Sequence, residues 1–316
     1  MTKALLFLFL MFSLFSCFRR KSAPTNISGW LEQQFPGQFN VVISNLKMLD
    51  IKAQFKGEKR ALIASQSEPE VQFLLDWEKG TPSLGVDSAT VLRLYEASKA
   101  DAVQARALFQ RLTSAGLSRF SAGVIQPAAY IQVYAEPEPE ARRQVLTTIL
   151  AALAVEAPQT SIYVEWMEPE AYHTEFQDII PLGHWSTGMG WQRENNIMSI
   201  NFEWKAGLQA TQLLAHWALN PESKRCAGFR QEAYRQALAW AEKKLSPPFF
   251  LPPDEPSGYE VVETEAGPAI RYCFPYFDKA LPATDSVETP EPAGYVCGTY
   301  SADQRRFSGI RKQADF

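Results

Sequence analysis

Hydrophobic and polar residues alternate along residues 38–77, which is the period of two that half-buried strands show. The last of these strands carries its apolar side chains on one face, at Val71, Phe73, Leu75 and Trp77. From Asp87 to Leu117 the apolar positions change to helical spacing. We therefore expect one long helix there, or two consecutive helices separated near Ser98.

Two further strands, at residues 119–126 and 128–135, are separated by Pro127. Residues 139–156 form a helix that is apolar around much of its circumference, so it should be deeply buried, and a strand then ends near Trp166. The order from about residue 70 to 167 is strand, helix, strand, strand, helix, strand. This order predicts an α+β fold with a ferredoxin-like βαββαβ core, which the N-terminal antiparallel strands extend or flank.

Beyond Glu168 a second α+β pattern follows. Residues 196–204 alternate like a strand, and helical spacing occupies residues 207–219 and 227–245. Strands at 259–263 and 269–274 flank a turn and predict a hairpin. The second unit, residues 181–316, is expected either as a separate domain or packed as one body with an α+β domain at 26–180.

The first seventeen residues have a different layout. Lys3 precedes a run of about fifteen mostly apolar residues, fewer than the about 20 needed to span a bilayer, and Cys17 ends the segment. A cation, a short apolar run and small residues are typical of a secretory signal.

Leu14-Phe15-Ser16-Cys17 resembles the lipobox of bacterial lipoproteins. The resemblance implies that Cys17 is the lipid attachment site and the first residue of the mature chain, with residues 18–25 as a tether. It also implies a membrane-anchored protein of the bacterial cell envelope, facing the periplasm or the cell surface. Arg19-Arg20-Lys21 leaves alternatives open, because basic residues after an apolar run favour the cytoplasmic side. An uncleaved anchor, ordinary secretion and a cytoplasmic body are these alternatives.

Composition narrows the function classes. The chain has 316 residues, 46% of them hydrophobic and 21% charged, which is typical of a globular protein. Its formal net charge of −4, without a basic stripe, argues against nucleic acid as a partner. No cofactor motif and no metal-ligand spacing is found, so we expect neither a cofactor nor a metal.

Three cysteines remain once Cys17 is assigned to the lipid. Cys273 and Cys297 both lie in strand-like segments, and a disulfide between them would close a loop of about 25 residues. Two buried free thiols are the alternative. Cys226 begins a helix and has no evident partner.

Reactive side chains gather in one stretch, at Glu165, Glu168, Glu170, His173, Glu175, Asp178 and His184. The spacing matches no metal or catalytic motif, and a solvated polar helix would have the same composition. Aromatic residues interleave with this stretch, and exposed tryptophans can anchor a partner or stack on sugars. The candidate binding surface therefore comprises Trp166, Trp185, Trp191, His173 and His184, with a buried core as the alternative for the tryptophans.

An export signal joined to a body without a catalytic motif favours a lipid-anchored envelope protein that is not an enzyme. It would bind another protein or an envelope component, and an inhibitory or immunity-type partner is one form. The alternative is a hydrolase of envelope glycan or peptide that uses carboxylates around residues 168–178. No catalytic residue is assigned.

Overall fold

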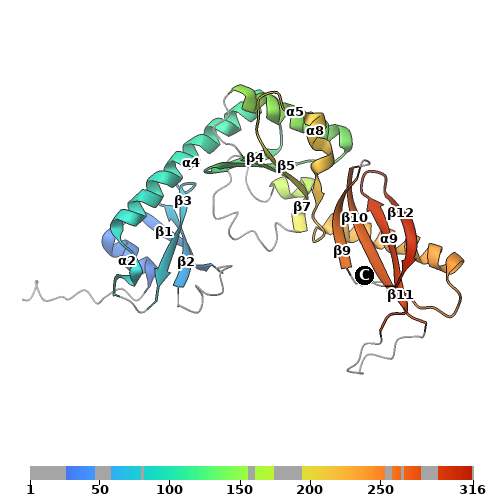
Figure 1. The fold of residues 1–316 in the computed structure, drawn as a ribbon. Coiled ribbons are helices and arrows are strands. Elements are labelled where there is room, and N and C mark those ends of the chain that lie inside the picture. The colour runs from blue at the N-terminus through green and yellow to red at the C-terminus, as the bar shows by residue number, and fades with distance from the viewer. Residues whose placement is uncertain are drawn as a thin grey trace, which may run out of the picture. The chain divides into compact units, whose positions relative to one another are not determined.

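A computed structural model describes residues 26–46, 58–79, 82–155, 161–173, 194–252, 258–264, 267–278 and 291–314. The signal, the tether and the strand segment at 51–56 lie outside these residues. The chain divides into two compact units between Ala97 and Ser98, at a point within helix α4 (Ser88–Ser114). Helices and sheets occur in both units, so the fold is α+β (Figure 1). Among the described residues, no helix has the length and hydropathy needed to cross a membrane.

The first unit is built on a three-stranded antiparallel sheet, β1 (Phe39–Leu46), β2 (Glu58–Ser65) and β3 (Gln72–Glu78). The expected apolar face of β3 is confirmed, since Val71, Phe73, Leu75 and Trp77 are all buried. Helix α2 (Ile27–Gln34), which the alternation pattern did not predict, begins after Asn26, whose side chain accepts a hydrogen bond from the Gly29 amide at 2.8 Å. Its apolar residues join those of the sheet in one core.

A five-stranded sheet forms the first part of the second unit, in the order β4-β5-β6-β7-β8. Its strands are β4 (Phe120–Ile125), β5 (Ala128–Tyr134), β6 (Ser161–Met167), β7 (Asn196–Glu203) and β8 (Ala218–Leu219). Strands β5 and β6 are parallel, because helix α5 (Pro139–Val155) carries the chain back between them; the other pairs are antiparallel.

The order of elements from β3 to β6 matches the expected one, but the ferredoxin-like sheet does not form. That topology would place the first strand between the third and the fourth. Here β3 pairs with β2 in the first unit, and β5 pairs directly with β6. The expected arrangement is wrong because strand order within a sheet depends on pairing between distant segments, which periodicity does not reveal.

Helix α5 is as deeply buried as its sequence predicts. Leu146, Ile149 and Leu153 have no exposed surface, and they pack with the sheet residues Ile131 and Val164 in a single core. The C-terminal part of α4 adds Leu108 and Leu112 to that core, while on α5 only the outward side chains, such as Val155, are exposed.

A second antiparallel sheet, in the order β12-β11-β10-β9, completes the second unit. Its strands are β9 (Gly258–Thr264), β10 (Gly267–Tyr276), β11 (Gly294–Ser301) and β12 (Arg306–Gln313). Helix α9 (Lys224–Lys244) contacts β10, β11 and β12, and also β7 of the five-stranded sheet. Ala233, Ala237 and Ala241 form a fully buried stripe on α9, so small side chains let the helix lie close to its neighbours.

The helix expected at 207–219 is much shorter in the structure. Helix α8 (Ala210–Leu213) is followed by a single 3₁₀ turn (Leu214–His216) and by strand β8, which pairs with β7. The boundary expected near residue 180 is not where the compact units divide, because β7 beyond it pairs with β6 before it.

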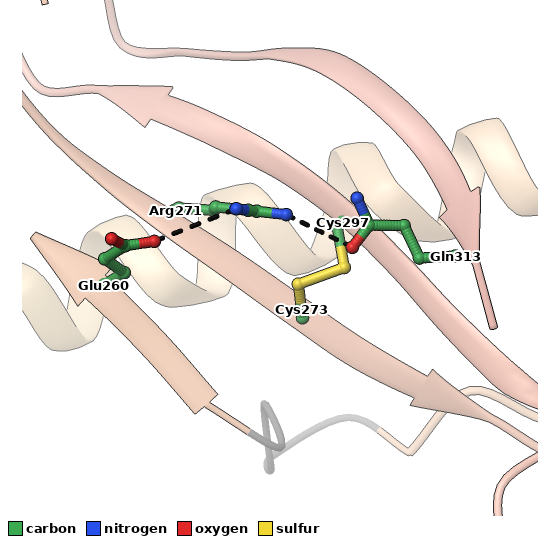
Figure 2. Close-up of a disulfide and its surroundings, with 5 residues drawn as sticks. All are labelled: Glu260, Arg271, Cys273, Cys297 and Gln313. Carbon is green, nitrogen blue, oxygen red and sulfur yellow. Dashed lines mark hydrogen bonds and ion pairs between the residues drawn. A yellow bond between two sulfur atoms is a disulfide. The ribbon is translucent and has the colours of Figure 1, made fainter. Parts of the chain in front are cut away.

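A disulfide joins Cys273 on β10 to Cys297 on β11, which are directly paired across the two strands (Figure 2). Beside it the Arg271 guanidinium lies between the side chains of Glu260 and Gln313. Both cysteines are buried, so the bridge fastens the two central strands of the sheet inside the fold.

Truncating Leu153 to alanine should lower the free energy of unfolding by about 2–5 kcal/mol, because the side chain has no exposed surface and leaves a cavity. Val155, on the same helix and 80% exposed, provides the matched control. Val155→Ala should change stability by less than about 0.5 kcal/mol. Urea denaturation followed by tryptophan fluorescence measures both, and equal effects would contradict the buried position of α5.

Candidate functional site

A polar pocket of about 420 Å³ opens within the second unit. Four segments line it: the loop between β5 and α5, strand β7, the N-terminal half of α9, and the turn between β11 and β12. Most of its lining residues are charged, namely Glu136, Glu138, Lys224, Arg225, Glu232, Asp303 and Arg305. Its apolar lining residues are Pro137, Met198, Phe229 and Ala302.

The parallel pairing of β5 and β6 brings two acidic residues together at the carboxyl ends of these strands. Tyr134 pairs with Met167 at the carboxyl ends of these strands. Glu136 follows β5 and Glu168 follows β6, so both leave the sheet at the same place. The carboxyl ends of parallel strands are a common position for binding sites in α/β sheets.

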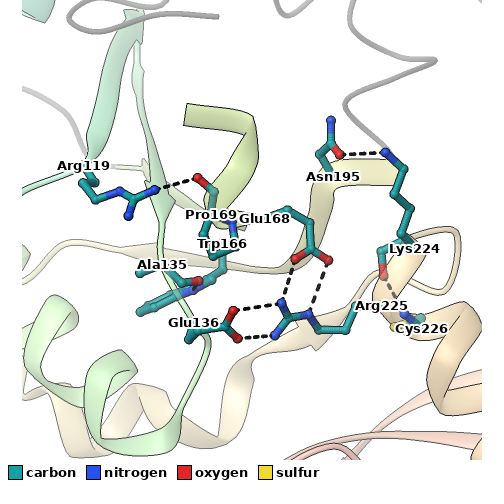
Figure 3. Close-up of polar contacts among 11 residues, drawn as sticks. Arg119, Ala135, Glu136, Trp166, Glu168, Pro169, Asn195, Lys224, Arg225 and Cys226 are labelled. Carbon is teal, nitrogen blue, oxygen red and sulfur yellow. Dashed lines mark hydrogen bonds and ion pairs between the residues drawn. The ribbon is translucent and has the colours of Figure 1, made fainter. Parts of the chain in front are cut away.

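Arg225, in the first turn of α9, lies between these two carboxylates (Figure 3). Its Nη1 donates to Glu136 Oε2 at 2.6 Å and its Nη2 donates to Glu168 Oε2 at 2.8 Å. Two longer hydrogen bonds, each of 3.3 Å, make both contacts bidentate. A guanidinium suits this role because its planar array of donors matches the geometry of two carboxylates.

Opposite charges within the triad of Arg225, Glu136 and Glu168 stabilise one another. Burial disfavours the charge of Arg225, but the hydrogen bonds to Glu136 and Glu168 outweigh burial and raise the pKa of Arg225. The hydrogen bond from Arg225 in turn lowers the pKa of Glu136. Arg225 and Glu136 therefore each favour the charged form of the other.

A second arginine, Arg142, binds one of the residues that line the pocket. Arg142 on α5 is only 2% exposed; it donates to Asp303 in the β11–β12 turn and to Met198 Sδ at 3.7 Å. Burial raises the pKa of Asp303, an effect that the charge of Arg142 opposes. Gly267 makes room for this pair, because a Cβ there would lie 2.4 Å from Asp303 Oδ2. The ion pair between buried Arg142 and partly exposed Asp303 thus attaches the turn to α5.

On α9, Glu232 accepts a hydrogen bond from the Tyr300 hydroxyl. Burial and this contact raise the pKa of Tyr300, so the phenol stays neutral and acts as the donor. Phe229, one turn earlier on α9, stacks on the Tyr300 ring with centroids 5.2 Å apart. A carboxylate and an aromatic ring therefore lie together on one side of the pocket.

Of the candidate binding surface drawn from the sequence, the structure describes the side chain of Trp166 alone. Trp166 is fully buried rather than exposed; its indole N–H donates to the Ala135 carbonyl at 2.5 Å, and its ring meets Trp217 edge to face. It lies on the core face of β6, so it belongs to the core. Trp185, Trp191 and His184 lie outside the described residues. His173 ends the short 3₁₀ helix Pro169–His173, and only its backbone is described.

The acidic stretch from Glu165 onward divides among three environments. Glu168 is held by Arg225, and Glu170 is exposed on the 3₁₀ helix. Glu165, on β6, accepts a hydrogen bond from Gln132 Nε2 at 2.8 Å, and the Tyr134 hydroxyl donates to Gln132. Burial raises the pKa of Glu165. Glu175 and Asp178 lie outside the described residues.

Cys226 is a free and buried cysteine. Burial raises the pKa of its thiol to about 11, so the thiolate that a nucleophile needs is scarce at neutral pH. In the part of the chain that the structure describes, no three histidine, cysteine or acidic side chains are grouped to hold a metal ion.

Sequence reasoning missed Glu136, Arg225, Asp303 and Arg305. One signal was available: Lys224 and Arg225 occupy the first turn of a helix, where the helix dipole disfavours cations. Basic residues at that position indicate nearby carboxylates. The partners themselves could not be named, because they lie 57 and 89 residues away in the chain.

The described residues thus define an α+β protein of two compact units with a charged, arginine-centred pocket in the second. No protein-family model and no curated protein sequence matches the chain. Among solved structures, a DUF5037 family protein from Ruminococcus gnavus is similar at 12% sequence identity with a TM-score of 0.35. The match covers 58% of this chain and 91% of that one.

The raised pKa of Glu165 gives a pH-dependent prediction. A carboxyl whose pKa is higher in the folded state stabilises the fold most at acidic pH, and that contribution is lost as the pH rises. Glu165→Gln, which stays neutral, should therefore gain stability over the wild type between about pH 4.5 and about pH 8. Urea denaturation at both pH values measures this difference. Glu170→Gln, at an exposed position, is the control, and a pH-independent effect of Glu165→Gln would contradict burial of the carboxyl.

Proposed function

We propose that the protein is a lipid-anchored component of the bacterial cell envelope that binds a partner through the arginine-centred pocket and catalyses no reaction. The partner is another protein or an envelope component. The observation that carries the binding role is the pocket itself, whose volume of about 420 Å³ lies within the range of specific binding sites.

The ion pairs of Arg225 and Asp303 support a role of these two groups in recognition rather than in catalysis. Arg225 makes four hydrogen bonds to Glu136 and Glu168, and Asp303 is bound by Arg142. A general base or nucleophile needs a group that is free to take a proton or attack a substrate. Groups fixed in this way instead provide a rigid, charged surface, which favours selective binding over chemistry.

The lipobox-like segment supports the location. Lipid chains on Cys17 would hold the protein at a membrane, and two or more acyl chains give stable anchoring where a single chain gives marginal binding. An anchored chain would then meet envelope partners at the membrane surface.

Lipid attachment is tested by metabolic labelling with a fatty-acid analogue in a bacterial host. The wild-type chain should incorporate the label and Cys17→Ser should not, because the thiol of Cys17 is the attachment point. Equal labelling of both proteins would contradict the anchor and leave the location of the two units to another mechanism.

The binding role is tested by filling the pocket from Gly228. This glycine lines the pocket on α9, and a Cβ added there meets nothing within 4 Å, so a longer side chain extends into open space. Gly228→Gln should block the pocket without loss of stability, since glutamine favours the helix over glycine by about 0.5–1 kcal/mol. The matched control is Gly228→Ala, which adds only one methyl group.

The full anchored chain and both variants are crosslinked in cells, purified, and compared by quantitative mass spectrometry of the captured molecules. We expect one partner to be retained by the wild type and by Gly228→Ala and to be lost from Gly228→Gln. Capture that is the same for all three proteins would contradict binding through this pocket.

A further inference from the structure

Negative charge exceeds positive charge around the pocket. The lining carboxylates are Glu136, Glu138, Glu232 and Asp303, and the lining cations are Lys224, Arg225 and Arg305. The groups bonded directly to them include Glu168 and Arg142, which leave the carboxylates in excess. Lys224 adds little to the positive side, because its Nζ already lies 3.8 Å from Glu194 Oε2.

Glu232 is one of the carboxylates that contribute to this excess. Its Oε2 accepts a hydrogen bond from the Tyr300 hydroxyl, which is a neutral donor. Within the described residues no cation forms an ion pair with Glu232. Phe229 lies one turn away on the same helix and also lines the pocket. A carboxylate beside an aromatic ring is the combination that binds ammonium and guanidinium groups, through charge and through the ring face.

We propose that the pocket takes a cationic group, a lysine or arginine side chain of a basic protein segment, with Glu232 as its counter-ion and Phe229 as its ring contact. This inference rests on the proposed function, since it names the chemistry by which the partner is recognised. The alternative is an acidic segment, which Arg305 and the N-terminus of α9 would bind. The test must distinguish an acidic occupant from a basic one.

The test measures binding of fluorescein-labelled oligolysine, oligoglutamate and glycine–serine peptides to the purified full chain by fluorescence anisotropy at low salt. The wild type should bind oligolysine and neither of the other two. Glu232→Gln should weaken oligolysine binding by at least about tenfold, the size expected for a lost charge-assisted hydrogen bond. Glutamine can still accept the Tyr300 hydroxyl, so the fold is preserved.

Two controls separate the pocket from the acidity of the whole chain, whose net charge of −4 attracts any polycation. Glu242→Gln removes the same charge from an exposed position on the same helix and should change the affinity by less than about twofold. Arg305→Gln removes a repelling charge from the pocket and should leave oligolysine binding intact or strengthen it. Gly228→Gln, which blocks the pocket, should weaken oligolysine binding as Glu232→Gln does.

Three results would overturn the proposal: equal effects of Glu232→Gln and Glu242→Gln, binding of oligoglutamate that Arg305→Gln abolishes, or no binding of oligolysine by the wild type. After any of these three results, the pocket would still count as a binding site if Gly228→Gln loses its partner in the crosslinking experiment. Failure of that capture experiment, in contrast, removes the pocket as a binding site altogether.

Discussion

The second unit depends on one interaction, the bridge that Arg225 makes between Glu136 and Glu168. The two carboxylates follow the carboxyl ends of β5 and β6 in the five-stranded sheet. The guanidinium belongs to helix α9, which contacts the second sheet. The side chains of Arg225 and Glu168 are 23% and 13% exposed, so solvent screens their attraction only partly. The bridge therefore fixes where α9 begins relative to the ends of β5 and β6.

The pocket follows from this constraint. Parallel pairing of β5 and β6 places two chain exits side by side, and α9 is held across them by its first turn. Arg142 fixes the β11–β12 turn on the other side through Asp303. Arg225 and Arg142 thus hold the β5–α5 loop, α9 and the β11–β12 turn around the pocket. The lining carboxylates Glu138 and Glu232, which neither arginine binds, add negative charge to it.

Local features of the fold could be predicted, because they depend on residues that are near one another in the sequence. The alternation from Val71 to Trp77 identified β3, and the apolar circumference of residues 139–156 identified the buried helix α5. Pairing between segments could not be predicted in the same way. β3 has the pattern that a ferredoxin-like core requires, yet it pairs in another sheet, and nothing in its own residues distinguishes the two outcomes.

The candidate site was harder to predict for the same reason. Trp166 has the composition of a binding residue, but whether a tryptophan is exposed depends on what packs against it, here Trp217 from a distant segment. The acidic stretch did contain one residue of the pocket, Glu168. Its role follows only from Arg225, which the sequence places 57 residues further along.

A double-mutant cycle tests the bridge most directly. The free energies of unfolding of the wild type, Arg225→Met, Glu168→Gln and the double variant are measured by urea denaturation at neutral pH and low salt. A bridge that fixes α9 to the sheet predicts a coupling energy of about 1–3 kcal/mol between the two positions. Effects that add to within about 0.5 kcal/mol would contradict it, and would show that α9 is positioned by its apolar contacts alone.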